Sequence, residues 1–220
     1  MSRYEKKFGF SPEVKPILEN LLYYEGFKKA YPRRSISSFY YDDASFSNYS
    51  DSIRGHGCRL KLRARMYNMD PSKIVLERKL RDNDLGYKTY DFSTACRGKN
   101  LDVLYRDGIS DFPVTLQLPK TLDGSNKPIL AVRYSRDYYQ SILHPDLRVT
   151  IDFKIGYGRI HAGKSFCTAV IDHPTDRCVL EIKVPQQHED LISFGTKVLQ
   201  RLHLTNERHS KYCNAVEILF

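Results

Sequence analysis

The segment Cys58–Tyr67 reads CRLKLRARMY and alternates apolar with basic side chains. Successive residues of a β-strand point to opposite faces of a sheet. This segment is therefore predicted to be a strand with one apolar face and one basic face. The basic face is formed by Arg59, Lys61, Arg63 and Arg65.

The same alternation returns in three later segments. Charged or polar residues alternate with apolar ones at Glu77 and Lys79, between Arg148 and Lys154, and again around Glu181. For any one strand, a solvent-exposed face would explain the charges. Their recurrence favours one charged surface shared by several strands. Because burying so many cations in a dry interior would be prohibitive, this surface is expected to line a water-filled channel that polyanions enter.

The net charge of the chain indicates that its partners are anions. The chain has 220 residues, and 35 Lys and Arg against 26 Asp and Glu give a net charge of +9. Such a field attracts nucleic acids, phosphorylated metabolites, polyphosphate or acidic lipid surfaces. The basic residues alternate with aliphatic side chains rather than with exposed stacking aromatics, so no nucleic acid is expected as a partner.

The cysteines and the amino terminus indicate a cytoplasmic protein. The 5 cysteines are odd in number and scattered, which is typical of a reduced protein without zinc or disulfides. The first ten residues are charged and lack the apolar core of a signal peptide, and no apolar run reaches membrane-spanning length. Contact with a membrane would therefore need a partner protein.

Most of the chain is predicted to form strands, and one α+β domain over residues 1–220, dominated by antiparallel strands, is expected. The predicted strands are residues 4–10, 35–41, 58–67, 73–80, 87–92, 129–139, 146–157, 164–171 and 177–184. Helices are predicted at 12–24 and 189–202, with short ones within 42–54 and near Leu101. The tail 210–220 is compatible with either a strand or a helix.

The chemistry suggested by these residues is phosphoryl transfer. The chain has no phosphate-binding glycine loop, no metal-ligand spacing of histidines and no recognisable nucleophile motif. Basic side chains with a few carboxylates suit a reaction that needs charge neutralisation and positioning more than covalent help. Arginine binds phosphate with two donors, lysine supplies a compact charge, and glutamate can hold a divalent ion. A closed antiparallel barrel of about eight strands could enclose such a channel.

Short motifs across nearly the whole chain resemble the VTC domain, the catalytic part of the vacuolar transporter chaperone polyphosphate polymerases. This domain belongs to the triphosphate tunnel metalloenzyme superfamily. The motifs occur in the family's order and are Arg3–Phe8, Arg63–Tyr67, Glu77–Lys79, Tyr134–Arg136, Arg148–Asp152, Leu180–Lys183 and Ser210–Tyr212.

The resemblance implies a closed, eight-stranded antiparallel β-barrel tunnel with flanking helices. It further implies a transferase that uses a divalent metal, usually manganese with magnesium as the alternative. This metal-dependent polyphosphate polymerase would transfer the γ-phosphate of ATP to a growing polyphosphate chain, so ATP and polyphosphate are the expected partners.

The site residues follow from matching positions. The family's phosphate-binding basic residues match Lys7, Arg63, Arg65, Lys79, Lys88, Arg136, Arg148 and Lys211, and its metal ligand matches Glu181. Glu5 is a secondary candidate for the metal. Lys61, Lys183 and Arg208 share the inferred faces and are further candidates for substrate binding.

Two alternatives remain open at this point. A tripolyphosphatase or nucleoside triphosphatase of the same fold would use water as the acceptor. A non-catalytic polyphosphate-binding module would need no metal, and Glu181 would then only form an ion pair with a neighbouring arginine. The hydrolases and cyclases of the superfamily typically begin with alternating glutamates before a lysine, whereas this chain has Arg3, Glu5 and Lys7, which favours the polymerase.

Overall fold

The computed structural model describes residues 3–70, 74–82, 85–91, 114–116, 125–162 and 167–220. The strands are β1 (Arg3–Phe10), β2 (Phe27–Asp42), β3 (Cys58–Tyr67), β4 (Val75–Asp82), β5 (Leu85–Asp91), β6 (Val114–Leu116), β7 (Lys127–Ser141), β8 (Arg148–Ala162), β9 (Cys167–Ala169), β10 (His173–Thr175) and β11 (Cys178–Pro185). The α-helices are α1 (Lys15–Tyr24), α2 (Ser47–Arg54), α3 (Asp190–Gln200) and α4 (Lys211–Leu219), and two short 3-10 helices, η1 (Pro12–Val14) and η3 (Gln186–His188), precede α1 and α3. No helix of these described ranges is long and apolar enough to cross a membrane.

The predicted α+β class, with antiparallel strands and flanking helices, is confirmed. The main path of the sheet runs β1-β11-β8-β7-β2-β3-β4-β5, with β6, β9 and β10 attached beside it. Among the described strands, β1 and β5 are the two ends of this order, so the expected closed barrel is not observed there. The outer edge of β1 offers a physical reason. The Lys7 backbone N–H donates to Asn206 Oδ1 (3.3 Å), and the Lys7 carbonyl accepts from Glu207 N (2.9 Å), so a chain segment already occupies this edge.

Contacts divide the chain into two compact units, and each is described by itself. Unit 1 comprises Met1–Arg34, Tyr134–Ile155 and Thr175–His209. Unit 2 comprises Ser35–Arg133, Gly156–Pro174 and Ser210–Phe220. Whether they behave as the single domain expected from the sequence stays a prediction.

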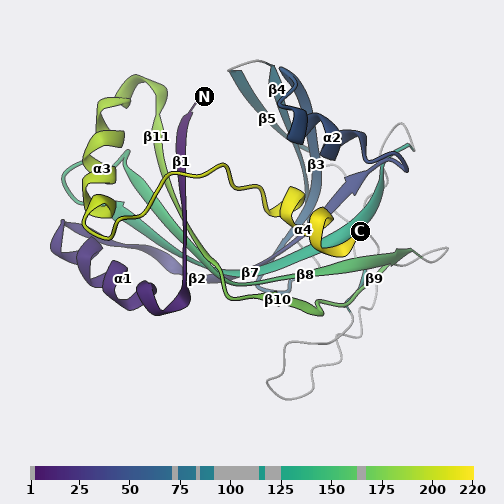
Figure 1. The fold of residues 1–220 in the computed structure, drawn as a ribbon, viewed down its shortest axis with the longest axis horizontal. Coiled ribbons are helices and arrows are strands. Elements are labelled where there is room, and N and C mark those ends of the chain that lie inside the picture. The colour runs from purple at the N-terminus through teal and green to yellow at the C-terminus, as the bar shows by residue number, and fades with distance from the viewer. Residues whose placement is uncertain (1–2, 71–73, 83–84, 92–113, 117–124, 163–166) are drawn as a thin grey trace. The chain divides into compact units, whose positions relative to one another are not determined.

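In unit 1, helices cover one face of the strands (Figure 1). Leu18 and Leu22 of α1 and Ile192 and Leu199 of α3 belong to one buried cluster. The cluster also contains Leu147, just before β8, and these strand residues: Phe8, Phe10, Phe27, Tyr139, Val149, Ile151, Phe153, Cys178, Leu180, Ile182 and Val184. Because side chains alternate along a strand, the residues between them point to the other face of the sheet.

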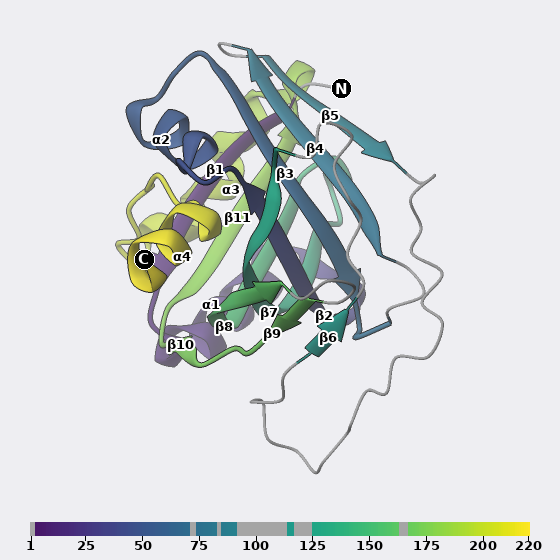
Figure 2. The ribbon, with the colours of Figure 1, turned by 90° about the vertical axis from the view of Figure 1, so that its right-hand side faces the viewer.

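In unit 2, helices α2 and α4 lie side by side (Figure 2). The buried Tyr212 of α4 donates a hydrogen bond from its hydroxyl to Asp42 at the end of β2. Asp42 also accepts backbone hydrogen bonds from Asn48 and Tyr49 in the first turn of α2 (3.0 and 3.1 Å). One carboxylate therefore caps α2 and fastens α4.

The apolar face of β3 also lies where the alternation predicts it. Leu62, Ala64 and Met66 are buried in a cluster with Phe39 and Leu76. The basic residues between them consequently point to the opposite face.

The structure decides the open assignment of the tail and moves the start of one predicted strand. The tail is a helix, begun by Ser210, whose hydroxyl accepts a hydrogen bond from Cys213 N (3.3 Å). Strand β2 begins at Phe27, well before the predicted start at Ser35. Pro32 and the basic residues around it gave no strand pattern in the sequence. In the structure, Phe27 is buried in the core and Arg33 forms an ion pair with Asp137. The helix predicted near Leu101 lies outside the described residues.

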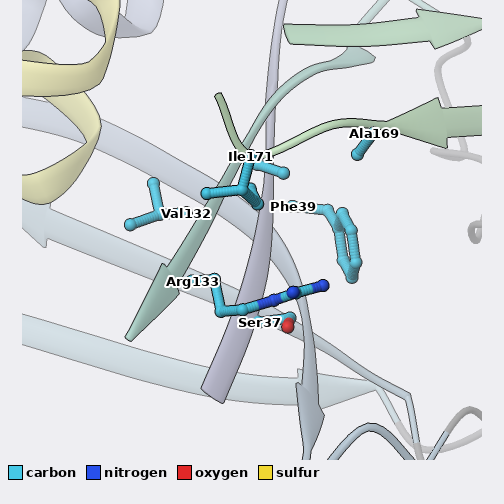
Figure 3. A pocket seen from close by; sticks show the side chains of 7 residues that line it. Ser37, Phe39, Val132, Arg133, Ala169 and Ile171 are labelled. Carbon is cyan, nitrogen blue, oxygen red and sulfur yellow. The ribbon is translucent and has the colours of Figure 1, made fainter. Parts of the chain in front are cut away.

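A small pocket in unit 2 is too small for a phosphate substrate. It is lined by Ser37, Phe39, Ala131, Val132, Arg133, Ala169 and Ile171 (Figure 3). Its free volume of about 10 Å³ is enough for roughly one water molecule. The candidate site is therefore sought on the charged faces of the strands.

Candidate functional site

Strand register in unit 1 places charged residues in two adjacent rows. Lys7 of β1 is opposite Glu181 of β11, which in turn is opposite Thr150 of β8. Lys183 forms the next row, with Glu5 on one side and Arg148 on the other. These residues lie on the face opposite the apolar cluster, because they alternate with its members.

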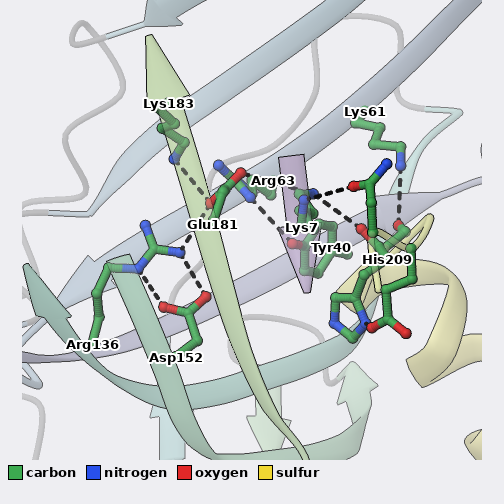
Figure 4. Close-up of polar contacts among 12 residues, drawn as sticks. Lys7, Tyr40, Lys61, Arg63, Arg136, Asp152, Glu181, Lys183 and His209 are labelled. Atoms are coloured by element: carbon green, nitrogen blue, oxygen red, sulfur yellow. Dashed lines mark hydrogen bonds and ion pairs between the residues drawn. The ribbon is translucent and has the colours of Figure 1, made fainter. Parts of the chain in front are cut away.

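Glu181 is the centre of this arrangement. It is 8% exposed, and its carboxylate lies 2.9 Å from Lys183 Nζ. Arg136 Nη2 lies 3.8 Å away and Lys7 Nζ lies 3.9 Å away (Figure 4). Three cations from three strands thus surround one carboxylate.

Arg136 joins Glu181 to a second buried carboxylate, that of Asp152. The Arg136 Nε and Nη2 atoms donate to the two oxygens of Asp152, at 2.5 and 2.7 Å (Figure 4). Burial by itself would lower the pKa of the Arg136 guanidinium, but Asp152 and Glu181 raise it well above its ordinary value. Arg136 therefore stays charged and is held in one orientation.

The hydroxyl of Thr150 is an orphaned polar group on this face. It is buried and, among the described residues, has no hydrogen-bond partner. Because Thr150 is directly opposite Glu181, a ligand or water between them would satisfy it. In the described part of the chain, no three His, Cys, Asp or Glu side chains could together hold a metal ion. A divalent ion bound to phosphates needs only one or two carboxylates, however, so Glu181 beside this hydroxyl fits such an ion.

Lys7 is also tied to the carboxyl-terminal part of unit 1. Its Nζ donates to the carbonyl oxygen of His209 at 3.0 Å (Figure 4). His209 is buried, and its Nδ1 lies 3.7 Å from Glu207 Oε1. The segment at the edge of β1 therefore fixes both the backbone and the side chain of Lys7.

In unit 2, Arg63 and Arg65 share one carboxylate. Arg63 Nε donates to Glu77 Oε2 at 2.7 Å, and Arg65 Nη1 lies 3.5 Å from Glu77 Oε1. Ser38 and Tyr67 also accept hydrogen bonds from Arg65, each at 3.4 Å. Glu77 is 3% exposed and is directly opposite Arg63 in the sheet. Two arginines are thus oriented by one buried acid.

Three lysines form a row beside Arg63. Lys61, Lys79 and Lys88 are directly opposite one another across β3, β4 and β5. Like charges placed opposite each other destabilise a sheet unless an anion compensates them. Lys61 Nζ also donates to Ser210 Oγ at 3.1 Å, which brings the start of α4 to this row.

The structure distributes the predicted site residues over both units. Lys7, Arg136, Glu181 and Lys183 are in mutual contact in unit 1, whereas Arg63 and Arg65 share Glu77 in unit 2. The sequence further predicts that Arg63, Arg65, Arg136 and Arg148 line one channel, and this stays a prediction.

The remaining candidates are less enclosed. Glu5, Lys79, Arg148 and Arg208 are exposed, and Lys211 is partly exposed at the start of α4. Lys88 is placed only by its register opposite Lys79. The metal role of Glu5, which is exposed on β1, stays a prediction.

Sequence reasoning missed Asp152, Glu77 and Tyr40 as parts of the site. The period of two already placed Asp152 and Glu77 on the charged faces, so this signal could have identified them. Tyr40 lies outside the motifs that indicate the site, but its hydroxyl accepts a hydrogen bond from Arg63 Nη1 at 3.2 Å. Only the strand pairing of Tyr40 with Arg63 reveals this role.

Comparisons with known proteins agree with this architecture. The model of the VTC domain family matches residues 3–220. A proposed adenylate cyclase from Vibrio parahaemolyticus has a similar structure, with a TM-score of 0.54, 12% identity and 99% of each chain covered. A proposed adenylyl cyclase from Hippeastrum, with a reported dominant triphosphatase activity, has a TM-score of 0.51 and 13% identity over 99% of this chain and 97% of that chain. These two proteins share the fold. No curated protein sequence matched this chain.

Proposed function

This chain belongs to the VTC domain family, and we propose that it is a metal-dependent polyphosphate polymerase. It would transfer the γ-phosphate of ATP to the end of a growing polyphosphate chain. The proposal is supported by what the two charged faces contain.

The observation that carries the proposal is a surplus of cations on both units. In unit 1, the charged face carries four cations, Lys7, Arg136, Arg148 and Lys183, against the three carboxylates of Glu5, Asp152 and Glu181. In unit 2, Arg63 and Arg65 share the carboxylate of Glu77, and the paired strands beside them carry Lys61, Lys79 and Lys88. This supply of positive charge exceeds what one triphosphate needs, which favours a polymeric anion.

Each group has a defined task in the proposed reaction. The guanidinium groups of Arg63, Arg65 and Arg136 would hold and orient phosphate oxygens, because their planes are already fixed by carboxylates. Glu181 would hold a divalent ion, because enzymes of this class generally use divalent metals. When bound, that ion neutralises negative charge on the phosphate oxygens.

A hydrolase of the same fold is the second candidate. The similar structure from Hippeastrum is named for a dominant triphosphatase activity, and the same phosphate-binding groups would serve that reaction. The two reactions differ only in the acceptor, which is either water or the terminal oxygen of polyphosphate.

The decisive experiment incubates the pure protein with ATP and Mn²⁺ or Mg²⁺, with and without a short polyphosphate primer, and resolves the products on a gel. A polymerase lengthens the primer. Quantitative release of inorganic phosphate without polymer would instead identify the hydrolase. Binding of polyphosphate without turnover in either metal would identify a binding module.

A cytoplasmic location is part of the proposal. Cys58, Cys178 and Cys213 are free thiols, which is typical of a reducing compartment. A membrane partner would have to be tested by co-purification, and no nucleic acid is proposed as a substrate.

A further inference from the structure

Arg63 rests against a stack of two tyrosines. Tyr40 of β2 is directly opposite Arg63, and its hydroxyl accepts a hydrogen bond from Arg63 Nη1 at 3.2 Å (Figure 4). The ring of Tyr212 from α4 stacks on that of Tyr40, with centroids 5.2 Å apart and an angle of 25° between planes. The guanidinium carbon lies 5.9 Å from the centre of the Tyr40 ring. Residues from three distant parts of the sequence are thus in one continuous stack.

The far end of this stack is firmly anchored. Tyr212 is 2% exposed and donates its hydroxyl proton to Asp42. Burial, followed by the bond to Asp42, raises the pKa of Tyr212 far above its ordinary range, so the phenol remains a donor. Asp42 is itself fixed by backbone N–H groups of α2.

Arg63, at the near end of the stack, is held by Glu77 as well as by Tyr40. Glu77 accepts from Arg63 Nε, while Tyr40 accepts from Nη1 of the same guanidinium. A planar group bound through two of its nitrogens has one orientation, and phosphate recognition by arginine depends on that orientation.

We propose that Tyr40 and Tyr212, held by Asp42, are positioning residues for Arg63. They set the plane in which Arg63 presents its donors to a phosphate group. This inference rests on the proposed function, in which Arg63 binds phosphate. It makes the attachment of α4, at the end of the sequence, a determinant of anion affinity.

Conservative substitutions separate positioning from folding. Tyr212→Phe retains the stacked ring and removes only the hydrogen bond to Asp42. The Asp42 carboxylate keeps its backbone donors from Asp43, Asn48 and Tyr49, so it stays paired and α2 stays capped. Tyr40→Phe removes the acceptor for Arg63 and serves as a second, independent variant.

The chain offers a matched control. The hydroxyl of Tyr49 in α2 lies 3.5 Å from Glu217 of α4, so it joins the same two helices without touching the stack. Tyr49→Phe should therefore leave Arg63 and anion binding unchanged.

The first measurement is the affinity for inorganic tripolyphosphate by calorimetry. Tyr40→Phe and Tyr212→Phe should each weaken binding about three- to tenfold. When either is combined with Arg63→Lys, the loss of affinity should be smaller than the sum of the two single losses, because the effects of coupled residues are not additive. Combined with Arg136→Lys, their effects should add. Full additivity with Arg63→Lys, or unchanged affinity in both tyrosine variants, overturns the proposal.

The second measurement needs no ligand and no activity. In ¹H–¹⁵N spectra, the Nε–H signal of Arg63, assigned with Arg63→Lys, should shift or broaden in both tyrosine variants while that of Arg136 stays in place. An unmoved Arg63 signal, or equal changes at Arg136, would contradict positioning. If the wild type fails to bind tripolyphosphate, the proposed function fails, and the spectra still decide the role of the tyrosines.

Discussion

Arg33 and Arg136 each bind an aspartate through two nitrogens, yet the surroundings of the two pairs differ in charge. Arg33 donates to Asp137 at 2.7 and 2.9 Å, and Arg136 donates to Asp152 at 2.5 and 2.7 Å. Arg136 and Asp137 are neighbours on β7, so the two pairs lie on opposite faces of the same strand.

The pair at Asp137 is electrically balanced. Lys15 lies 3.1 Å from Asp137 and 2.9 Å from Glu19, so two cations face two carboxylates. Tyr139 completes the network with a hydrogen bond to Glu19. This network fastens α1 to the sheet and has no need of an external anion.

Around Asp152, three cations, Lys7, Arg136 and Lys183, contact a network of two buried carboxylates, Asp152 and Glu181. Glu5 and Arg148, which flank Lys183 in the next row, carry opposite charges, so one positive charge remains in excess. The number of ion pairs is therefore a poor indicator of function. The local balance between cations and carboxylates distinguishes a structural network from a site that needs an anion.

The largest effect is expected on turnover, which should depend on the carboxylate of Glu181 and not on that of Asp137. Glu181→Gln should reduce metal-dependent turnover of ATP at least about 100-fold, because the proposed metal ligand is lost. Metal-free binding of tripolyphosphate should stay intact or tighten, since a repelling charge is removed. Asp137→Asn should keep turnover within about twofold of the wild type. Equal losses of turnover in the two variants would abolish the distinction.

The arginines provide the next test. Arg136→Gln should weaken tripolyphosphate binding about 10- to 100-fold, because hydrogen bonds to charged groups contribute roughly 1.5–3 kcal/mol. Arg33→Gln should instead lower the free energy of unfolding by about 1–2 kcal/mol and leave binding unchanged. Calorimetry and urea unfolding measure the two quantities. A loss of affinity in Arg33→Gln would show that the balanced network also serves binding.

Acidic pH should weaken the stabilising contribution of the balanced network around Asp137. Burial by itself would raise the pKa of Asp137, but Arg33 and Lys15 lower it below its ordinary value of 3.8. A carboxyl with a lowered pKa stabilises the fold above its unfolded pKa, and this stability is lost as the pH falls through the folded pKa. The free energy of unfolding should therefore decrease below about pH 4, and less so in Asp137→Asn. Urea unfolding at neutral and acidic pH tests this, and equal acid sensitivity of the two proteins would be the contrary result.

The smallest effect concerns single lysines. Lys183→Gln should weaken tripolyphosphate binding about threefold, and the difference should shrink at high salt, because partly exposed charges contribute no more than about 1 kcal/mol. Lys15→Gln should leave the affinity unchanged at every salt concentration. A salt-independent loss in Lys183→Gln would indicate a packing effect rather than a charge effect.

The sequence predicted the charged faces because they depend on a local rule. The period of two in Cys58–Tyr67 and in the strand that contains Glu181 is sufficient to separate the two faces of each strand. The resemblance to the VTC domain then identified Glu181 and Arg136, which the structure places in contact.

Other features depend on contacts between distant residues and leave no periodic signal. Nothing local pairs Tyr212 with Asp42, and nothing in the segment around Pro32 announces a strand. The closed barrel was expected from the need to enclose the charged faces and from the resemblance. The segment along β1 could not be foreseen, because its contacts join residues about 200 positions apart.

That segment has a consequence for how the protein behaves in concentrated solution. An open strand edge is a template on which another chain can add a strand, and such growth leads to aggregation. At Lys7 both outward-facing backbone groups are occupied, by Asn206 and Glu207. Asn206 and Glu207 therefore hinder the addition of a strand at Lys7, whose side chain faces Glu181, so this position of β1 links the charged face to colloidal stability.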